Sequence, residues 1–244
     1  MFSENFQNNN NGWLEKSNPD VYMRVANGTY TISNESSSWC ASWNYFNCSK
    51  QNNFRIVTRL KCCYTSLTSG FGIIWGVRDI DNFVSFQISS DLRSYQFSEC
   101  KNGKWNYRNR SRLRFRALPY APLVIELSVR ENGRFVSADI KDYRYHFMDP
   151  PPFDLNGGIG FICPGHTRIE VYSLFLPDCE PKLNHSNKKA GHVSYFEDEK
   201  FFPKEYIKSD GKVTTDYFEW RQDYDEGGYL QDEDYFIYGF DHDD

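Results

Sequence analysis

The 244-residue sequence has no long apolar run. No stretch approaches the roughly 20 apolar residues that a transmembrane helix needs, and the mean hydropathy is -0.70. The segment 1–6 has neither the basic start nor the apolar stretch of a secretory signal. We therefore expect no membrane span and a cytoplasmic location.

The sequence also has no recognisable zinc-binding or redox motif. None of its seven cysteines forms a CxxC pair, and no histidines accompany them at zinc-ligand spacing. In a cytoplasmic protein we expect reduced thiols, several of them buried as small apolar side chains. In an oxidising compartment, Cys40 and Cys48 could close a hairpin.

Helical periodicity is the third absence. No window of helix length shows a 3.6-residue apolar stripe. The sequence instead contains 20 Phe, 17 Tyr and 6 Trp, residue types that favour strands. Short apolar or alternating segments are separated by Asn-Gly turns, at 28–32, 54–61, 71–77, 83–88, 123–129, 134–140, 159–163 and 169–176. The segment 71–77 is nearly continuously apolar, as in a central strand buried on both faces. Many short strands predict a sandwich or barrel.

Charge divides the chain. Residues 214–244 contain eleven acids and one base, which leaves 27 bases and 22 acids in residues 1–213. The body is therefore +5 and the tail −10. We predict three parts: a β-domain over 1–178, a polar linker over 179–213, and an acidic, aromatic-rich tail over 214–244.

Several motifs along 1–178 resemble those of concanavalin A-like lectin/glucanase modules, a superfamily that includes laminin-G-like domains. They are the opening Glu4-Asn5-Phe6 followed by Asn11-Gly12-Trp13, then Asn27-Gly28-Thr29-Tyr30, Phe71 to Gly76, Asn82 to Phe86, Asn156 to Phe161, and the closing segment 169–176. The resemblance implies a two-sheet antiparallel jelly-roll sandwich with Trp13 as a core anchor. It covers nothing after residue 178, and fold alone does not choose among lectin, adhesion and hydrolase roles.

Catalytic groups are not evident. Glucanases of this fold place two carboxylates on one strand face, as retaining hydrolysis requires, whereas Glu126 and Glu170 each stand alone in a predicted strand. We therefore expect no enzyme activity and no cofactor. Asp79 and Asp81 form an oxygen-rich turn that could hold calcium, but such turns more often serve their own backbone.

An arginine-rich segment is the sharpest local feature. Arginines recur with period two, so one extended strand would place all of them on one face: Arg108, Arg110, Arg112, Arg114 and Arg116. Three interpretations are open: a salt-bridge lattice with Glu126, Glu131, Asp139 and Asp142; an external anion such as an acidic glycan, nucleic acid or acidic protein segment; or binding of the chain's own acidic tail.

Three functional hypotheses follow, and we favour the first two over the third. The first is a protein-interaction subunit that docks to its partner through tail aromatics: Trp220, Tyr224, Tyr229, Tyr235, Phe236 and Tyr238. The alternative is a lectin-like module, in which Trp75, Trp105 and Tyr107 stack on a carbohydrate near the arginine segment. The third is a glycosidase-like enzyme with an unrecognised site.

Overall fold

A computed structural model describes residues 1–48, 53–65, 70–115, 121–154 and 157–181, together with the strand pairs at 206–207 and 213–214. Apart from one 3₁₀ turn, η1 (Glu131–Gly133), the regular structure of these residues consists of antiparallel strands. The prediction of an all-β, two-sheet antiparallel sandwich is confirmed.

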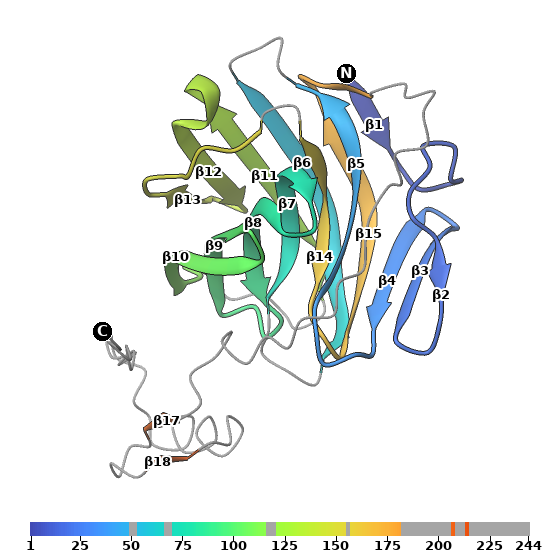
Figure 1. The fold of residues 1–244 in the computed structure, drawn as a ribbon, viewed down its shortest axis with the longest axis horizontal. Helices are drawn as coiled ribbons and strands as arrows, with labels where there is room; N and C mark the ends of the chain where they lie inside the picture. The colour runs from blue at the N-terminus through green and yellow to red at the C-terminus, as the bar shows by residue number, and fades with distance from the viewer. Residues whose placement is uncertain are drawn as a thin grey trace. The chain divides into compact units, whose positions relative to one another are not determined.

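The first layer is a nine-stranded sheet (Figure 1). Its strands lie in the order β13 (Tyr143–Phe147), β12 (Phe135–Ile140), β11 (Leu123–Arg130), β6 (Phe54–Thr65), β15 (Thr167–Leu176), β4 (Thr29–Asn34), β3 (Val21–Ala26) and β2 (Lys16–Ser17). β1 (Phe2–Glu4) pairs with the end of β15.

The second layer is a seven-stranded sheet. Its strands lie in the order β10 (Lys104–Arg112), β9 (Ser94–Lys101), β8 (Asn82–Ser89), β7 (Gly70–Asp79), β14 (Gly158–Cys163), β5 (Cys40–Asn47) and β16 (Glu180–Pro181). β10 is thus an edge strand, and it continues directly from β9 in the chain.

The burial pattern distinguishes strands that are buried on one face from strands that are buried on both faces. In β3, Val21, Met23 and Val25 are buried while the residues between them are exposed or half-buried, so one face packs on the core. In β7 the first eight residues are all buried, and β7 lies between β8 and β14. The sequence-based expectation of a central strand here is confirmed.

Two Asn-Gly turns close hairpins as predicted. Asn27 and Gly28 have φ angles of 54° and 76°, and Asn102 and Gly103 have 51° and 74°. Positive φ at both central residues matches the right-handed twist of the flanking strands. These turns connect β3 to β4 and β9 to β10.

The opening motif ties the N-terminus to the core. The Glu4 carboxylate, only 4% exposed, accepts hydrogen bonds from the Phe6 backbone N–H at 2.8 Å, from Asn11 Nδ2 at 2.6 Å and from Trp13 Nε1 at 3.2 Å. Burial of a carboxylate requires such donors. Trp13 is buried and contacts Phe6, Tyr30 and Phe161, which confirms it as a core anchor.

One disulfide joins Cys48, at the end of β5, to Cys179, just before β16, with their Cα atoms 4.4 Å apart. The prediction of reduced thiols is therefore wrong for these two residues. The alternative pairing of Cys40 with Cys48 is wrong too, because Cys40 carries a free thiol and is buried in β5. The sequence did not reveal the pairing because the two cysteines lie 131 residues apart and meet only when β16 pairs with β5.

The two sheets belong to one compact unit, Met1–Glu197. A second unit, Asp198–Asp244, contains the short antiparallel pair β17 (Tyr206–Ile207) and β18 (Val213–Thr214). Within the described part of the chain, no helix has the length and apolar character needed to cross a membrane.

Candidate functional site

The face of the seven-stranded sheet that points away from the nine-stranded sheet carries polar residues. In β8, Val84, Phe86 and Ile88 contribute to the core between the sheets. The residues between them point the other way because side chains alternate along a strand. Cross-strand partners share a face, and Ser85 pairs with Ser98 and Gln87 with Gln96. We call these four residues the polar row.

The polar row is buried and partly hydrogen-bonded. Each of its side chains is at most 5% exposed. Gln87 Nε2 donates to Ser85 Oγ at 2.9 Å, and Ser85 Oγ donates to Ser98 Oγ at 3.3 Å. The Gln96 side chain makes no hydrogen bond with another described residue, although its amide has two donors and an accepting oxygen.

Aromatic rings lie on the same face. Trp105 pairs with Cys100, which pairs with Phe83, and Tyr107 pairs with Ser98 of the polar row. The Trp105 and Tyr107 rings are parallel within 4°, with centroids 5.8 Å apart. Both side chains are half-buried, so this ring pair is the accessible part of the face.

Ring contacts also show that the face curves inward. Trp39, which immediately precedes β5, makes edge contacts with Phe83 in β8 at 5.5 Å and with Trp105 in β10 at 5.4 Å. β14 and β7 lie between β5 and β8. Side chains from these separated strands meet only if the sheet bends toward that side, in agreement with the burial of the polar row.

Two indole N–H groups on this face have no partner. Trp39 Nε1 and Trp43 Nε1 are buried and lack any hydrogen-bond acceptor in the structure. A buried donor left unsatisfied costs about 1–3 kcal/mol. Trp43 lies against the glycines of β14, because a Cβ at Gly158 would come within 2.3 Å of Trp43 Cδ1. The glycine-rich sequence of β14 therefore makes room for this indole.

Two parts of the predicted ligand-binding set are corrected. Trp75 is fully buried in the core, where it contacts Phe153, so it cannot stack on a ligand. The arginines also do not share one face. A β-bulge shifts the β9–β10 register between Arg108, which pairs with Phe97, and Ser111, which pairs with Tyr95, so the alternation of faces reverses.

The remaining predicted residues divide as follows. β10 ends at Arg112, Arg114 follows it, and Arg110 lies within the bulge. Arg116 and the tail aromatics lie outside the described residues: Trp220, Tyr224, Tyr229, Tyr235, Phe236 and Tyr238. Trp105 and Tyr107 are the two predicted residues that the structure brings together with the polar row.

The predicted salt-bridge lattice is wrong for two of its acids. Glu126 pairs with Arg55 at 3.5 Å, and Asp139 pairs with Arg144 at 2.7 Å. All four residues belong to strands of the nine-stranded sheet, and their partly exposed side chains place both pairs on its exterior. These acids therefore do not neutralise the arginines of β10.

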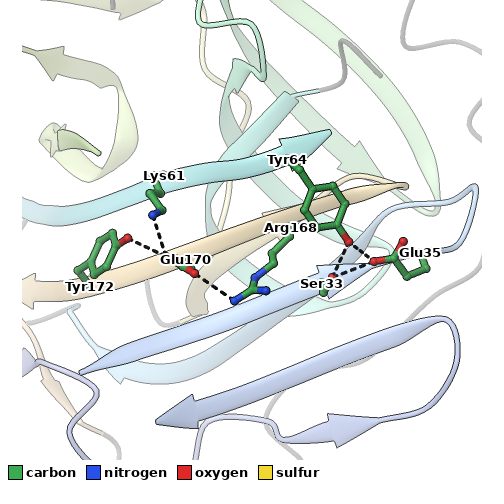
Figure 2. A network of polar contacts seen from close by, with 7 residues as sticks. All are labelled: Ser33, Glu35, Lys61, Tyr64, Arg168, Glu170 and Tyr172. Atoms are coloured by element: carbon green, nitrogen blue, oxygen red, sulfur yellow. Dashed lines mark hydrogen bonds and ion pairs between the residues drawn. The ribbon is translucent and has the colours of Figure 1, made fainter. Parts of the chain in front are cut away.

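Glu170, the one carboxylate in β15, is held by two cations and a hydroxyl. Figure 2 shows it between Lys61 and Arg168, each 3.1 Å away, with the Tyr172 hydroxyl donating to it at 2.7 Å. Burial raises the pKa of Glu170, but hydrogen bonds from Tyr172 and Lys61 outweigh burial and lower it. Hydrogen bonds of the Lys61 ammonium with Tyr172 and with Glu170 raise the pKa of Lys61.

The network has a second part at the end of the sheet (Figure 2). The Ser33 hydroxyl donates to Glu35 at 3.0 Å, and the Tyr64 hydroxyl also donates to Glu35. Burial, together with the hydrogen bond to Glu35, raises the pKa of Tyr64. Together the two parts connect β4, β6 and β15 on their exposed side, which is a stabilising arrangement.

In the turn between β7 and β8, one carboxylate accepts hydrogen bonds from groups within the turn. Asp79 Oδ1 accepts hydrogen bonds from the Asp81 backbone N–H at 2.9 Å and from Asn82 Nδ2 at 2.8 Å. Within the described ranges, no group of three or more histidines, cysteines or acids is placed to hold a metal ion. Calcium at Asp79 and Asp81 stays a prediction.

Comparison with known proteins supports the fold. No family model and no curated protein matches the chain. Among solved structures, a protein of unknown function with a galectin-like fold from Bacillus subtilis matches 75% of this chain and 97% of its own, with 10% identity and a TM-score of 0.51. The GH43 BlXynB protein from Bacillus licheniformis matches 71% of this chain with 10% identity and a TM-score of 0.50, but only 38% of its own length.

The galectin LEC-6 of Caenorhabditis elegans is also similar, with 16% identity and a TM-score of 0.40 over 68% of this chain and 96% of its own. At such identities these likenesses concern the fold and not the ligand. The two structures with TM-scores of 0.51 and 0.50 share the fold of this chain, in agreement with the two-sheet jelly-roll sandwich that the sequence motifs predicted.

Proposed function

We propose that this chain is a carbohydrate-recognition module, and that it binds its ligand on the outer face of the seven-stranded sheet at the edge formed by β10. Trp105 and Tyr107 form the accessible part of this site, and the polar row lies beside them. This proposal favours the lectin-like alternative over the protein-interaction reading.

The chemistry of the face suits a sugar. A pyranose has an apolar face of C–H groups that can lie against an aromatic ring, and hydroxyls that need both donors and acceptors. Ligand sites combine mostly apolar walls with a few placed polar groups. Trp105 and Tyr107 supply the rings, and the Gln87 and Gln96 amides supply a donor and an acceptor each.

One observation carries the proposal. Trp39 Nε1 and Trp43 Nε1 are both buried on this face without an acceptor, and they are two of the four such side-chain atoms among the described residues, with Trp75 Nε1 in the core and Arg168 Nε on the other sheet. Hydroxyl oxygens of a sugar would satisfy such donors. Because these N–H groups are buried, a ligand beside Trp105 reaches them only when a neighbouring side chain moves, and Trp39 is in contact with Trp105.

A hydrolytic role has less support. The GH43 protein shares the fold over part of its length only. In the described part of this chain, Glu126 and Glu170 are each held by cations on the other sheet. Retaining and inverting hydrolases both need two carboxylates that flank one bond. This arrangement does not supply such a pair.

The test is a glycan array with the full chain, followed by calorimetry on the best ligand. Trp105→Ala removes a stacking ring, and Gln96→Leu removes an amide at similar size. Each change should weaken binding about fivefold or more. Phe135→Ala is the matched control, because Phe135 is an aromatic residue 52% exposed on the nine-stranded sheet. The proposal fails if no glycan is retained, or if binding is the same in all three variants.

An interaction role through the acidic tail is the second candidate. The observation that favours it is the charge separation between residues 1–213, at +5, and residues 214–244, at −10. Acidic aromatic segments of this kind can dock on a basic partner. Loss of a co-purifying protein when residues 214–244 are deleted would support this role, and an unchanged set of partners would contradict it.

A further inference from the structure

The hairpin of β9 and β10 carries an excess of positive charge. Glu99 is the one acid among residues 94–114, against six lysines and arginines. Four of these cations are exposed: Lys101, Lys104, Arg112 and Arg114. We call these four residues the basic edge. Arg112 pairs with Ser94 and so lies on the face of the half-buried Trp105 and Tyr107, whereas Lys101 and Lys104 pair with each other at the tip of the hairpin and lie on the other face of this outermost strand pair.

The acids expected to neutralise this hairpin lie elsewhere. The acids of the nine-stranded sheet pair with cations of that sheet: Glu126 with Arg55, which also contacts Asp178, Glu170 with Lys61 and Arg168, and Asp139 with Arg144. Like charges close together repel one another. The basic edge therefore attracts an anion from outside the sheet.

The length of the basic edge selects an extended anion. Lys104 and Arg112 lie at the two ends of β10. At about 3.3 Å per residue, the strand separates them by roughly 26 Å. A single phosphate or monosaccharide would contact only one end. A linear chain with an acidic group on successive units could lie over Trp105 and Tyr107, contact Arg112 on the same face, and reach Lys104 around the open edge of β10.

We propose that the ligand is an acidic glycan, a linear polysaccharide with carboxylate or sulfate groups. The acidic groups bind the basic edge, and one sugar ring stacks on the Trp105–Tyr107 pair. Arginine binds such groups through two parallel N–H donors. This inference rests on the proposed function and adds the chemical class of the sugar.

The ring geometry excludes a nucleobase inserted between Trp105 and Tyr107. The Trp105 and Tyr107 rings are parallel with centroids 5.8 Å apart. A nucleobase inserted between two rings needs about 3.4 Å on each side, roughly 7 Å in all. The two rings therefore offer no slot for a base, although their outer surfaces can still contact the flat side of a sugar.

The experiment compares four probes on the full chain: a sulfated glycosaminoglycan oligosaccharide, a uronic acid oligomer, a neutral glucan of the same length, and single-stranded DNA of matched charge. One variant changes Lys101, Lys104, Arg112 and Arg114 to Gln. The matched control changes four exposed arginines of the nine-stranded sheet and its turn to Gln: Arg24, Arg59, Arg130 and Arg134. Both variants lose four charges, and melting temperatures confirm that both fold.

We expect the basic-edge variant to lose at least about tenfold in affinity for an acidic glycan, while the control stays within about twofold. Binding of the wild type should weaken as salt rises. Stronger binding of the sulfated than of the uronic probe, or the reverse, identifies the acidic group.

Each other outcome overturns a distinct statement. Equal binding of neutral and acidic glycans, unaffected by the basic-edge variant, would overturn this inference and leave the proposed function intact. If DNA binds as tightly as the acidic glycans, the result would overturn the assignment of a glycan and indicate a nucleic acid as the ligand. Retention of none of the four probes, with no ligand on the array, would overturn both proposals.

Discussion

Removal of the Cys48–Cys179 disulfide should destabilise the sandwich strongly. The bond joins the end of β5 to the segment before β16, across a sequence separation of 131 residues. It therefore closes the part of the domain from β6 to β15 into one loop. We expect the double variant Cys48→Ala/Cys179→Ala to fold with a lower free energy of unfolding.

The magnitude follows from the chain entropy of the unfolded state. Closing a loop of this length removes conformational freedom worth about 5 kcal/mol at 25 °C, and measured values for native disulfides are typically 2–4 kcal/mol. The expected loss is therefore about 2–5 kcal/mol. Cys63→Ala serves as the control, because Cys63 carries a free, half-buried thiol.

The assay is urea denaturation of the wild type and the variants, with and without a reductant. The reductant should lower the stability of the wild type to that of the double variant and leave the double variant unchanged. Intact mass after thiol labelling should show five reactive thiols in the unfolded, unreduced chain. Seven labelled thiols, or a wild type insensitive to reductant, would refute the pairing.

Three further predictions concern single residues. Glu170→Gln should lower the free energy of unfolding by about 1 kcal/mol at neutral pH. Because the pKa of Glu170 is lowered in the folded state, the stabilisation by its carboxylate is present above about pH 4.3 and is lost as pH falls through the folded pKa. Urea denaturation across pH should therefore show that the variant loses less stability on acidification than the wild type. Gly160→Ala should lower the free energy of unfolding by about 3 kcal/mol, because the new Cβ would lie 2.0 Å from the Ser42 carbonyl oxygen. Gly12→Ala has open space and should lower it by about 1 kcal/mol, because Gly12 has a positive φ. Equal melting temperatures of the two variants would refute this difference. Burial, with the nearby Glu170, raises the pKa of Cys63 to about 11, so its alkylation at pH 7.5 should be about a hundredfold slower than that of an ordinary thiol, and a rate equal to that of a free thiol would contradict it.

The strands and hairpins were predictable because their signals are local. The continuous apolar segment of β7 and the Asn-Gly turns at Asn27 and Asn102 each depend on a few adjacent residues, and the structure confirms them. The alternation in β8 was visible too. It places Ser85 and Gln87 on one face and Val84 and Phe86 on the other.

The site was only partly predictable, because it depends on pairing between distant strands. Trp105 and Tyr107 were found from their place among the arginines, but nothing in the sequence joined them to Ser85, Gln96 or Trp39. Ser and Gln at alternate positions of 83–89 and 94–100 were the available signal. The β9–β10 bulge places the arginines before and after it on opposite faces, and the regular spacing of these arginines in the sequence does not indicate the bulge.

Indole resonances give the most direct test of the central claim, that the outer face of the seven-stranded sheet binds a glycan. In a titration of the full chain labelled with ¹⁵N at tryptophan, the Nε1–H signals of Trp39, Trp43 and Trp105 should shift, because these side chains belong to that face. The signals of Trp13 and Trp75, buried in the core between the sheets, should stay in place. Glycan binding that leaves Trp39, Trp43 and Trp105 unshifted would contradict the account.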